Sequence, residues 1–344
     1  MIKFLKQIAY TLFVLFSIAS LVFLLFSFSF PDPEQMVVGE RTDQQTKDAI
    51  KKELGLDKSK LAQYFSYIND LSPIGWADVN QSSIIPLYTS GQSCLALKLP
   101  YLRRSFQNGQ PVTTLLKEAL PGTLALALSS ILMAAFLGII AGVFSALFYN
   151  KWPDRILLAL TTAGISVPSF FSAIVFAWLF GYVLYDYTHL PMTGSLFDYD
   201  PFNGRTLELK NLILPTLALG IRPLSVVTQL TRNSLKEELG KDYIRTAYAK
   251  GLSKQRVIVK HALRNAINPV VTSLSGWFAS LLAGAFFVEY IFNWKGLGKI
   301  TIEALEKSDL PVVMGSVLFV AVLFVSINML VDGLYRLIDP RIQS

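Results

Sequence analysis

The stretch from Lys241 to Val271 reads KDYIRTAYAKGLSKQRVIVKHALRNAINPVV and joins two of the most apolar runs of the chain. Its positive charges come every few residues, yet small and apolar side chains recur at helical spacing on both sides of Gly251. Gly251 can end a first helix, and the Ser253 hydroxyl can cap a second one. The stretch therefore predicts a helix, a turn and a helix. The residues at helical spacing are Ile244, Ala247, Tyr248 and Gly251, then Val259, Ala262, Leu263, Ala266, Ile267 and Val270, with Arg256, Lys260 and Arg264 on another face.

The runs on either side indicate a membrane protein. The chain has 344 residues, of which 52% are hydrophobic and 16% are charged. A bilayer core needs roughly 20 apolar residues per helix, and a helix satisfies its own backbone groups there. The long tracts lack the alternation of a membrane β-barrel. We predict an all-α, polytopic membrane protein with about six spans, near Ile8–Phe30, Leu120–Tyr149, Ile156–Tyr185, Leu212–Leu230, Pro269–Val288 and Pro311–Val331.

The first apolar segment has features of a signal peptide, because Lys3 and Lys6 precede it. Its apolar run, FVLFSIASLVFLLFSFSF, is longer than the roughly 7–15 residues of a signal peptide's apolar region, and no A-x-A-like cleavage site follows before PDPEQ. We interpret it as a retained transmembrane helix.

The Lys and Arg content of the short loops predicts the orientation of the chain. From Arg232 to Arg264 there are nine basic and three acidic residues, so this loop supplies +6 of the formal net charge of +7. The basic loops agree if both termini are cytoplasmic, and this bias explains the basic pI without nucleic-acid binding. The predicted organisation is a first transmembrane helix at 1–30, an external, periplasmic-side region at 31–112, a membrane core at 113–333 that contains the cytoplasmic loop 232–268, and a cytoplasmic tail at 334–344.

We predict that the external region folds into a cap. It contains an amphipathic stretch around Thr46–Asn69, which is followed from Leu71 by the loop-like segment LSPIGWADVNQSS. Its charges are balanced, as expected for a water-exposed segment.

Several chemistries are excluded by residue content. Cys94 is the single cysteine, and the two histidines, His189 and His261, are predicted on opposite sides of the membrane. A metal cluster or a nucleophile with its base is therefore not expected. The segment NWKGLGKIT resembles a phosphate-binding loop, but Asn293 occupies the position of its first glycine and Ile300 that of its Ser or Thr. We predict that the chain is not an enzyme.

The pattern of the basic stretch leaves two roles open. An amphipathic helix pair can lie on anionic lipid headgroups, or it can dock a cytoplasmic protein.

The stretch is similar to the characteristic cytoplasmic loop of permeases of binding-protein-dependent ABC importers, in particular the B-type subunit of the dipeptide/oligopeptide/nickel branch. The wider family has E-A-A and, after three residues, Gly; here Arg245, Thr246 and Ala247 precede Gly251, which is the form of the peptide branch. Two features depart from the branch: Lys295 replaces a proline, and 71–99 resembles an insertion. Further similar segments occur in the same order: ELGLDKSKLAQYFSYI, SFQNGQPVTTLLKEALPGTLALAL, SVPSF, HLPMTG, VEYIFNWKGLG and LIDPRI.

The resemblance implies a type I ABC importer permease core in the bacterial inner membrane. Such a subunit pairs with a second, homologous permease, receives substrate from an extracytoplasmic binding protein and is driven by two cytoplasmic ATP-binding subunits. ATP and Mg would be bound by those ATPase subunits, and no cofactor by this chain; membrane lipid is the other expected partner. Di- or oligopeptides are the default substrate, with nickel complexes, glutathione-like compounds and small sugars left open. The alternative function is a self-sufficient secondary transporter or channel.

The resemblance also implies two groups of site residues. The external family motif comprises Glu289, Gly296 and Gly298. In the coupling loop, small Ala247 and Gly251 would permit close approach by an ATPase subunit. The proposed ATPase contacts are Asp242, Tyr243, Arg245, Ala247, Lys250 and Gly251.

One charge lies within a predicted span. Arg222 is about midway along the fourth span, where an ionised side chain costs at least a few kcal/mol unless it faces water or a partner. We predict that it faces the translocation pathway, where it attracts a peptide carboxylate or carbonyl, or pairs with the partner permease.

Small residues and prolines in the spans mark candidate packing sites and kinks. Gly138 and Gly142 form a G-x-x-x-G pair, and such residues let helices approach closely within the subunit or at a subunit interface. A second stripe comprises Gly276, Ser280 and Gly284. Pro168 and Pro215 are candidates for helix kinks.

Overall fold

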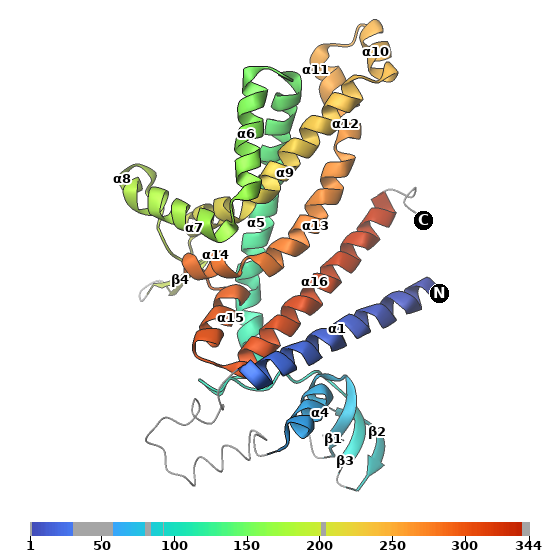
Figure 1. Cartoon of the computed structure of the whole chain (residues 1–344), viewed down its shortest axis with the longest axis vertical. Coiled ribbons are helices and arrows are strands. Elements are labelled where there is room, and N and C mark those ends of the chain that lie inside the picture. Colours follow the sequence, from blue (N-terminus) through green and yellow to red (C-terminus); the bar gives the residue numbers. More distant parts are fainter. Residues whose placement is uncertain (1, 30–57, 80–83, 92, 201–203, 339–344) are drawn as a thin grey trace. The chain divides into compact units, whose positions relative to one another are not determined.

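The computed structural model describes residues 2–29, 58–79, 84–91, 93–200 and 204–338 (Figure 1). These residues are predominantly helical, as predicted. They divide into two compact units: one comprises residues 1–119 and 300–323, and the other comprises 120–299 and 324–344.

The smaller unit combines apolar helices with a small antiparallel sheet. Its first helix is α1 (Ile2–Ser29), followed by α4 (Lys60–Leu71). Three strands then pair in the order β1-β3-β2. The Asn69 side chain joins α4 to the sheet, because its amide bonds both the N–H and the carbonyl of Trp76, at 2.8 and 2.9 Å. The strands are β1 (Ile74–Asp78), β2 (Ile84–Ser90) and β3 (Ser93–Lys98).

The prediction of a loop after Leu71 is wrong at β1. Ile74 pairs with Leu97 and Asp78 with Ser93, so the hydrogen bonds that order this segment come from a strand about twenty residues away. The local sequence, which contains Pro, Gly and Asn, does not reveal that pairing. The predicted amphipathic stretch Thr46–Asn69 lies outside the described residues up to residue 57, and its remainder falls in α4.

The core of the smaller unit joins three helices. Ala19 and Phe23 of α1 pack with Tyr67 of α4 and Leu318 of α16 (Leu310–Ile338). The rings of Phe23 and Tyr67 stack with centroids 5.5 Å apart. Apolar burial of this kind fixes α4 to α1 and α16 without a covalent link.

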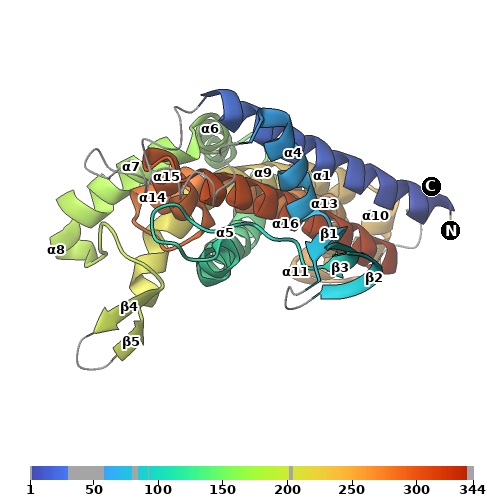
Figure 2. The ribbon, with the colours of Figure 1, turned by 90° about the horizontal axis from the view of Figure 1, so that it is seen from below.

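The larger unit is built from long and broken helices. In addition to most of α5 (Val112–Leu147), it contains α6 (Trp152–Ser166), α7 (Ser169–Trp178), α9 (Ile213–Leu239) and α13 (Asn268–Gly284). A hairpin extends away from these helices (Figure 2). The shorter elements are a π-turn at Leu179–Val183, α8 (Tyr185–Thr188), β4 (Phe197–Asp200), β5 (Gly204–Leu207), a 3-10 turn at Leu209–Leu212, α14 (Phe286–Ile291) and α15 (Leu297–Glu306), which continues into the smaller unit.

The third predicted span, Ile156–Tyr185, is not one straight helix. α6 and α7 meet at a bend of 109°. Val167 is extended there, as the residue before a proline prefers, and Pro168 precedes the first turn of α7. The predicted break at Pro168 is therefore confirmed. Pro215 lies in the first turn of α9, where a missing N–H removes no helical bond, and it makes no break.

Three described helices are long and apolar enough to cross a membrane, and a fourth span results if the bent pair counts as one. These are α5, α9 with the turn before it, and α16. The count of six spans and the cytoplasmic termini stay predictions.

Close helix packing in the larger unit uses one of the two predicted glycine stripes. A Cβ on Gly138 would lie 2.7 Å from Val227, and one on Gly142 would lie 2.5 Å from Thr231, so α5 and α9 approach at both glycines. Gly276 of α13 faces open space instead, and Ser280 is exposed. Packing within the subunit is thus confirmed for the first stripe. It is not found at Gly276 among the described residues, and a role of that stripe at a subunit interface stays a prediction.

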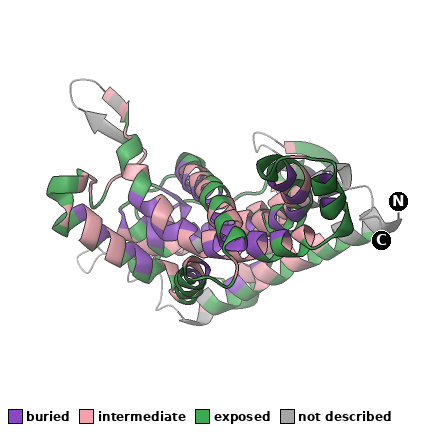
Figure 3. Cartoon of the chain, turned by 90° about the horizontal axis from the view of Figure 1, so that it is seen from above, coloured by how far each residue is buried: buried purple, intermediate pink, exposed green. Residues whose placement is uncertain are grey.

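Apolar side chains occupy both the interior and the outer surface of the helices. Leu126, Leu214, Leu281 and Phe292 are buried in one cluster, and buried residues concentrate where helices face one another (Figure 3). In the most apolar 18-residue stretch of α5, only 33% of the residues are buried. Exposed apolar surface of this extent is expected where lipid or another subunit covers it.

Candidate functional site

The predicted helix, turn and helix is present between α9 and α13. It consists of α10 (Asp242–Ala249), a turn at Gly251, and a second helical segment (Figure 1). That segment begins as α11 (Lys254–Arg256), continues as a π-helix at Val257–Ala262 and ends as α12 (Leu263–Ala266).

Gly251 ends α10 in a left-handed conformation, with φ of +77°. Its N–H donates to the Tyr248 carbonyl at 2.9 Å, and the Leu252 N–H donates to the Ala247 carbonyl at 3.3 Å. This pair of bonds is the Schellman motif, which favours glycine at this position. No other atom lies within 4 Å of a Cβ placed on Gly251, so backbone conformation rather than space requires the glycine.

Ser253 occupies the N-cap position of the second helical segment, but its side chain makes no capping hydrogen bond. The prediction of a hydroxyl cap is wrong. The backbone carbonyl of Ser253 accepts from the Val257 N–H at 3.0 Å, so the main chain alone begins this helix.

A small core holds the two helical segments together. Ile244 and Ala247 of α10 pack with Val257, Ala262 and Ala266, and also with Leu235 of α9 and Ala146 of α5. Ala247 is 7% exposed, so its side chain faces this core and not an outside partner.

Two predicted inward positions are wrong. Tyr248 is 43% exposed and Val259 is 58% exposed, whereas Val257 and Ile258 are buried. A π-helix places more residues in each turn than an α-helix. The π-turn at Val257–Ala262 therefore shifts the inward face away from the α-helical spacing.

The outer face of α10 is charged. Asp242, Arg245 and Lys250 are exposed, and Arg245 lies 3.4 Å from Asp242 in a pair too exposed to add much stability. Tyr243 has a structural role as well: its hydroxyl donates to Glu238 at 2.5 Å and accepts from Asn265 at 3.1 Å. It thereby ties α10 to both α9 and α12.

A buried ion pair lies next to this loop and helps to hold it in place. This pair was not predicted from the sequence. Arg232 of α9 donates through Nε and Nη2 to the two carboxylate oxygens of Asp154, at 2.6 and 2.7 Å. Asp154 is 1% exposed and also accepts from the Ser145 hydroxyl and, at 2.9 Å, from the Asn150 N–H.

The ion pair joins the turn between α5 and α6 to the helix that leads into α10. The Arg232 guanidinium also lies 4.8 Å from the ring centroid of Tyr149, whose hydroxyl accepts from Lys236 at 2.6 Å. In the sequence, Arg232 is one of nine basic residues in its loop, and its partner is 78 positions away. The only sequence signal for this ion pair was an acid in the first turn of α6. Such an acid is also common at helix N-termini, where it needs no basic partner.

The external family motif forms a second buried site. Glu289 of α14 is fully buried, and its carboxylate accepts from the Thr123 hydroxyl and the Gly298 N–H, both at 2.7 Å, and from the Lys299 N–H at 3.3 Å. A side chain on Gly296 would collide with this carboxylate. The three predicted motif residues, Glu289, Gly296 and Gly298, are therefore brought together.

The environment of Glu289 shifts its titration. Burial raises the pKa of the carboxyl to about 7, although its three hydrogen-bond donors act in the opposite direction. No cation pairs with it among the described residues.

Arg222 lies on α9 with its guanidinium 5.9 Å from the ring centroid of Trp277 on α13. Its Nε is buried and has no hydrogen-bond partner, and no acid pairs with it among the described residues. The described chain thus leaves a donor of this cation unsatisfied.

Comparisons with known proteins agree over nearly the whole chain. Residues 138–344 match the family of binding-protein-dependent transport system inner membrane components, and residues 1–127 match its N-terminal component. The chain is 35% identical to a putative peptide transport system permease protein of Brucella abortus (strain 2308), over 98% of each chain. It is 32% identical to the glutathione transport system permease protein of Escherichia coli (strain K12), over 96% of this chain and 94% of that protein.

The fold is also similar to a solved structure. The methionine ABC transporter MetNI in an inward-facing conformation matches with a TM-score of 0.52 and 18% identity, over 66% of this chain and 97% of that chain. At this identity the likeness concerns the fold alone.

Replacing Asp154 with Ala should strongly destabilise the larger unit, because it leaves the Arg232 charge buried and unpaired. We expect the free energy of unfolding to fall by about 3–5 kcal/mol, measured by denaturant titration of the purified chain in bicelles. The matched control is Arg155→Ala, which alters an exposed neighbour and should change stability by about 0.5 kcal/mol or less. Equal effects of the two variants would contradict a bracing role for the ion pair.

The Glu289 site should open more easily as pH rises. Because the pKa is higher in the closed site than in water, the stability that the neutral carboxyl provides is present below about pH 4.5 and is lost as pH rises towards 7. Hydrogen exchange of the Gly298 amide should show a protection factor that falls roughly 100-fold over this range. Glu289→Gln should remove most of the pH dependence. Protection that increases with pH would show that the three donors outweigh burial.

Proposed function

We propose that this chain, which belongs to the family of binding-protein-dependent transport system inner membrane components, forms half of the translocation pathway of a peptide importer. It is a multi-pass permease subunit of an ABC importer in a bacterial inner membrane. The peptide substrate is supported by relatives whose names specify peptide and glutathione transport.

The proposed assembly contains a second, homologous permease, two ATP-binding subunits and an extracytoplasmic binding protein. ATP and Mg would be bound by the ATP-binding subunits, and ATP hydrolysis would occur there. This chain would contribute the membrane path and the contact through which that hydrolysis moves it. The extensive exposed apolar surface of the helices is compatible with a second permease beside them.

The main support for this proposal is the structure of the loop around α10. Closure of an ATPase pair can drive the permease only through a contact whose fit differs between two states. α10 is a short rigid helix, fixed by its own core, by the Tyr243 hydrogen bonds and by the turn at Gly251. Motion imposed on it would pass to α9, and through the Asp154–Arg232 pair to α5 and α6.

The exposed residues of α10 suit a protein partner. Asp242, Arg245 and Lys250 present both signs of charge within two turns, whereas a headgroup-binding helix presents mainly basic residues. We infer that these three residues and Tyr243 contact the ATP-binding subunit, with Gly251 shaping the contact. Ala247 would act indirectly, by letting α10 pack closely on its own core.

Arg222 is our candidate for the substrate contact. Its Nε would be met by an acceptor that the described part of the chain does not supply, and a peptide presents both a terminal carboxylate and carbonyl oxygens. The alternative is that an acid or carbonyl of the second permease pairs with it.

Gly251→Val should uncouple transport from ATP hydrolysis. A β-branched residue pays about 1–2 kcal/mol in a left-handed turn, so the end of α10 would move. We expect the variant to insert and to pair with the second permease. With ATP, binding protein and all subunits in proteoliposomes, its peptide uptake should fall roughly tenfold or more.

The matched control for that turn is Gly251→Asn, because asparagine tolerates the left-handed conformation. This variant should retain most uptake, as should the charge-preserving Arg256→Lys and Lys260→Arg. Normal ATP-driven uptake by Gly251→Val would refute coupling through α10. Uptake by the chain alone, driven by an ion gradient, would establish the secondary transporter instead.

Arg222→Gln should weaken transport of peptides that carry a free C-terminal carboxylate. A lost charge-assisted hydrogen bond corresponds to roughly a 10- to 100-fold rise in the half-saturating peptide concentration. The same peptide with a C-terminal amide should be much less affected, and Arg222→Lys should restore part of the difference. Equal loss for both peptides would assign Arg222 to the second permease.

A further inference from the structure

The smaller unit contains an apolar groove that the coupling loop and Arg222 do not use. Side chains of α1, α4 and α16 line it, among them Leu12, Phe16, Ile68 and Phe319, and its volume is about 570 Å³. Walls that face an empty space of this size lose dispersion contacts, and water gains few hydrogen bonds among such side chains. Hydrocarbon is therefore the chemistry that fits the groove.

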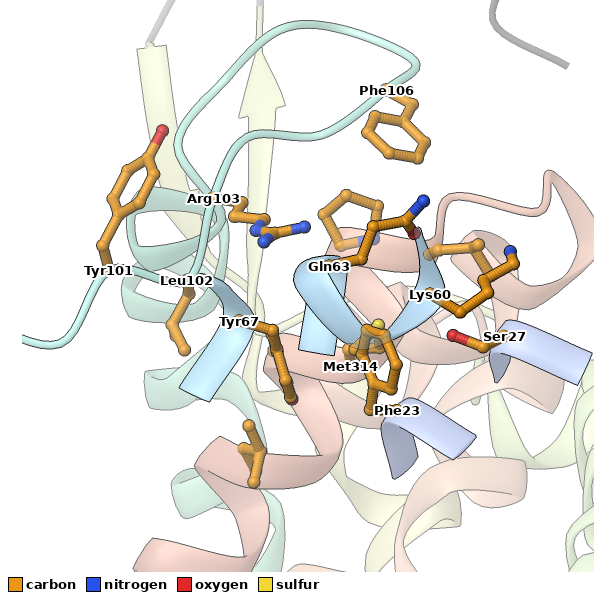
Figure 4. Close-up of a pocket in the computed structure, with 14 residues that line it drawn as sticks. Phe23, Ser27, Lys60, Gln63, Tyr67, Tyr101, Leu102, Arg103, Phe106 and Met314 are labelled. Atoms are coloured by element: carbon orange, nitrogen blue, oxygen red, sulfur yellow. The ribbon is translucent and has the colours of Figure 1, made fainter. Parts of the chain in front are cut away.

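A second cavity adjoins this groove and is polar. It has a volume of about 70 Å³, and Leu102 and Leu318 line both spaces. Its walls include Lys60, Gln63 and Arg103 beside the rings of Tyr67 and Phe23 (Figure 4). The two spaces together offer an apolar slot that ends in a polar pocket.

Tyr67 lines the polar pocket with its ring. The residue is 5% exposed, and its hydroxyl points away from Lys60 and Arg103 (Figure 4). The buried hydroxyl, which has no hydrogen-bond partner among the described residues, therefore does not join the two cations in the pocket.

The charge of the pocket selects an anion. Lys60 and Arg103 line it, and no acidic residue does among those that the structure describes. Lys60 makes no ion pair with a described residue. Arg103 also binds Asp70 at 3.1 Å, and its guanidinium lies 5.8 Å from the Tyr67 ring centroid. A phosphate would accept hydrogen bonds from both cations.

We propose that the groove and the pocket together bind one anionic glycerophospholipid, with its phosphate at Lys60 and Arg103 and an acyl chain along α1 and α16. The length of the site supports this ligand. Phe23 lines the pocket and Leu12 the groove, and these residues are separated by about 16 Å of helix. Half of a bilayer core, which one acyl chain spans, is about 15 Å.

Two other occupants fit less well. A transmembrane helix of the second permease could cover the apolar groove, but its backbone acceptors are already bonded and it would bring no anion to Lys60 and Arg103. Free phosphate could enter the polar pocket, but it would leave the groove empty. Of the three candidate occupants, only the lipid fills both the groove and the pocket. The following experiments distinguish the three.

Retention of lipid tests the polar pocket. The purified complex is exchanged into nanodiscs that contain dioleoyl phosphatidylglycerol in phosphatidylcholine, released into detergent, and analysed by native mass spectrometry. We expect one tightly held phosphatidylglycerol per chain, with retention reduced about tenfold in Lys60→Glu and in Lys60→Gln. Lys117→Glu, which alters an exposed lysine of the same unit outside the cavities, should retain the lipid.

Lys60→Gln keeps the test valid if Lys60→Glu folds poorly. It removes the charge of an exposed side chain without adding the opposite charge, so reduced lipid retention by a stable Lys60→Gln protein indicates a phosphate contact. Equal retention by wild type, Lys60→Glu and Lys60→Gln would overturn the proposal.

Photo-labelling tests the groove. Phosphatidylglycerol with a diazirine in its acyl chain should label peptides that contain residues 12–19 or 318–322, and this labelling should fall about tenfold in Lys60→Glu. Inorganic phosphate should not compete. Competition by phosphate would show an anion site without a lipid, and efficient cross-linking of Phe16→Cys to the second permease would show a subunit interface; either result overturns the proposal.

Discussion

The pairing of Asp154 with Arg232 is the interaction on which the loop between α9 and α13 depends. Both charges are withdrawn from water, so neither can leave the other without a large desolvation penalty. Their geometry fixes the turn between α5 and α6 against α9, and α5 also approaches α9 closely at Gly138 and Gly142. The core beneath α10 draws residues from both helices. The outward face of α10 is consequently set by a contact at the end of the membrane helices.

A comparison of Asp154 and Glu289 shows how the same burial produces two different sites. Asp154 has a guanidinium beside it and two further donors, an arrangement that suits a permanent ion pair. Glu289 has a hydroxyl and two backbone N–H groups but, among the described residues, no cation, and its pKa rises to about 7. The first arrangement holds two helices at a fixed distance at all ordinary pH values. The second closes a loop through a carboxyl that can change its charge near neutrality.

The sequence allowed prediction of those features that local physics determines. Apolar length located the long helices, a proline after Val167 located the break between α6 and α7, and Gly251 located the end of α10. Features that depend on distant partners were missed or wrong. Arg232 looks like any other basic residue until Asp154 is placed beside it, and β1 looks like a loop until β3 pairs with it. The exposure of Val259 follows from a π-turn that no residue type announces. The roles of Arg222 and of the charged face of α10 depend on partner chains, so they stay predictions.

Two exposed apolar surfaces of this chain suit different partners, and the side chains that line each surface indicate which partner fits. Along α13, Gly276 and Ser280 are small and open, which suits the close approach of another helix backbone. The groove lined by α1, α4 and α16 ends beside Lys60 and Arg103, which suits a flexible chain that carries an anion. A helix in the second surface would bring no anion to these cations, and a lipid gains nothing specific from the first. The two surfaces therefore separate a subunit contact from a lipid site on physical grounds.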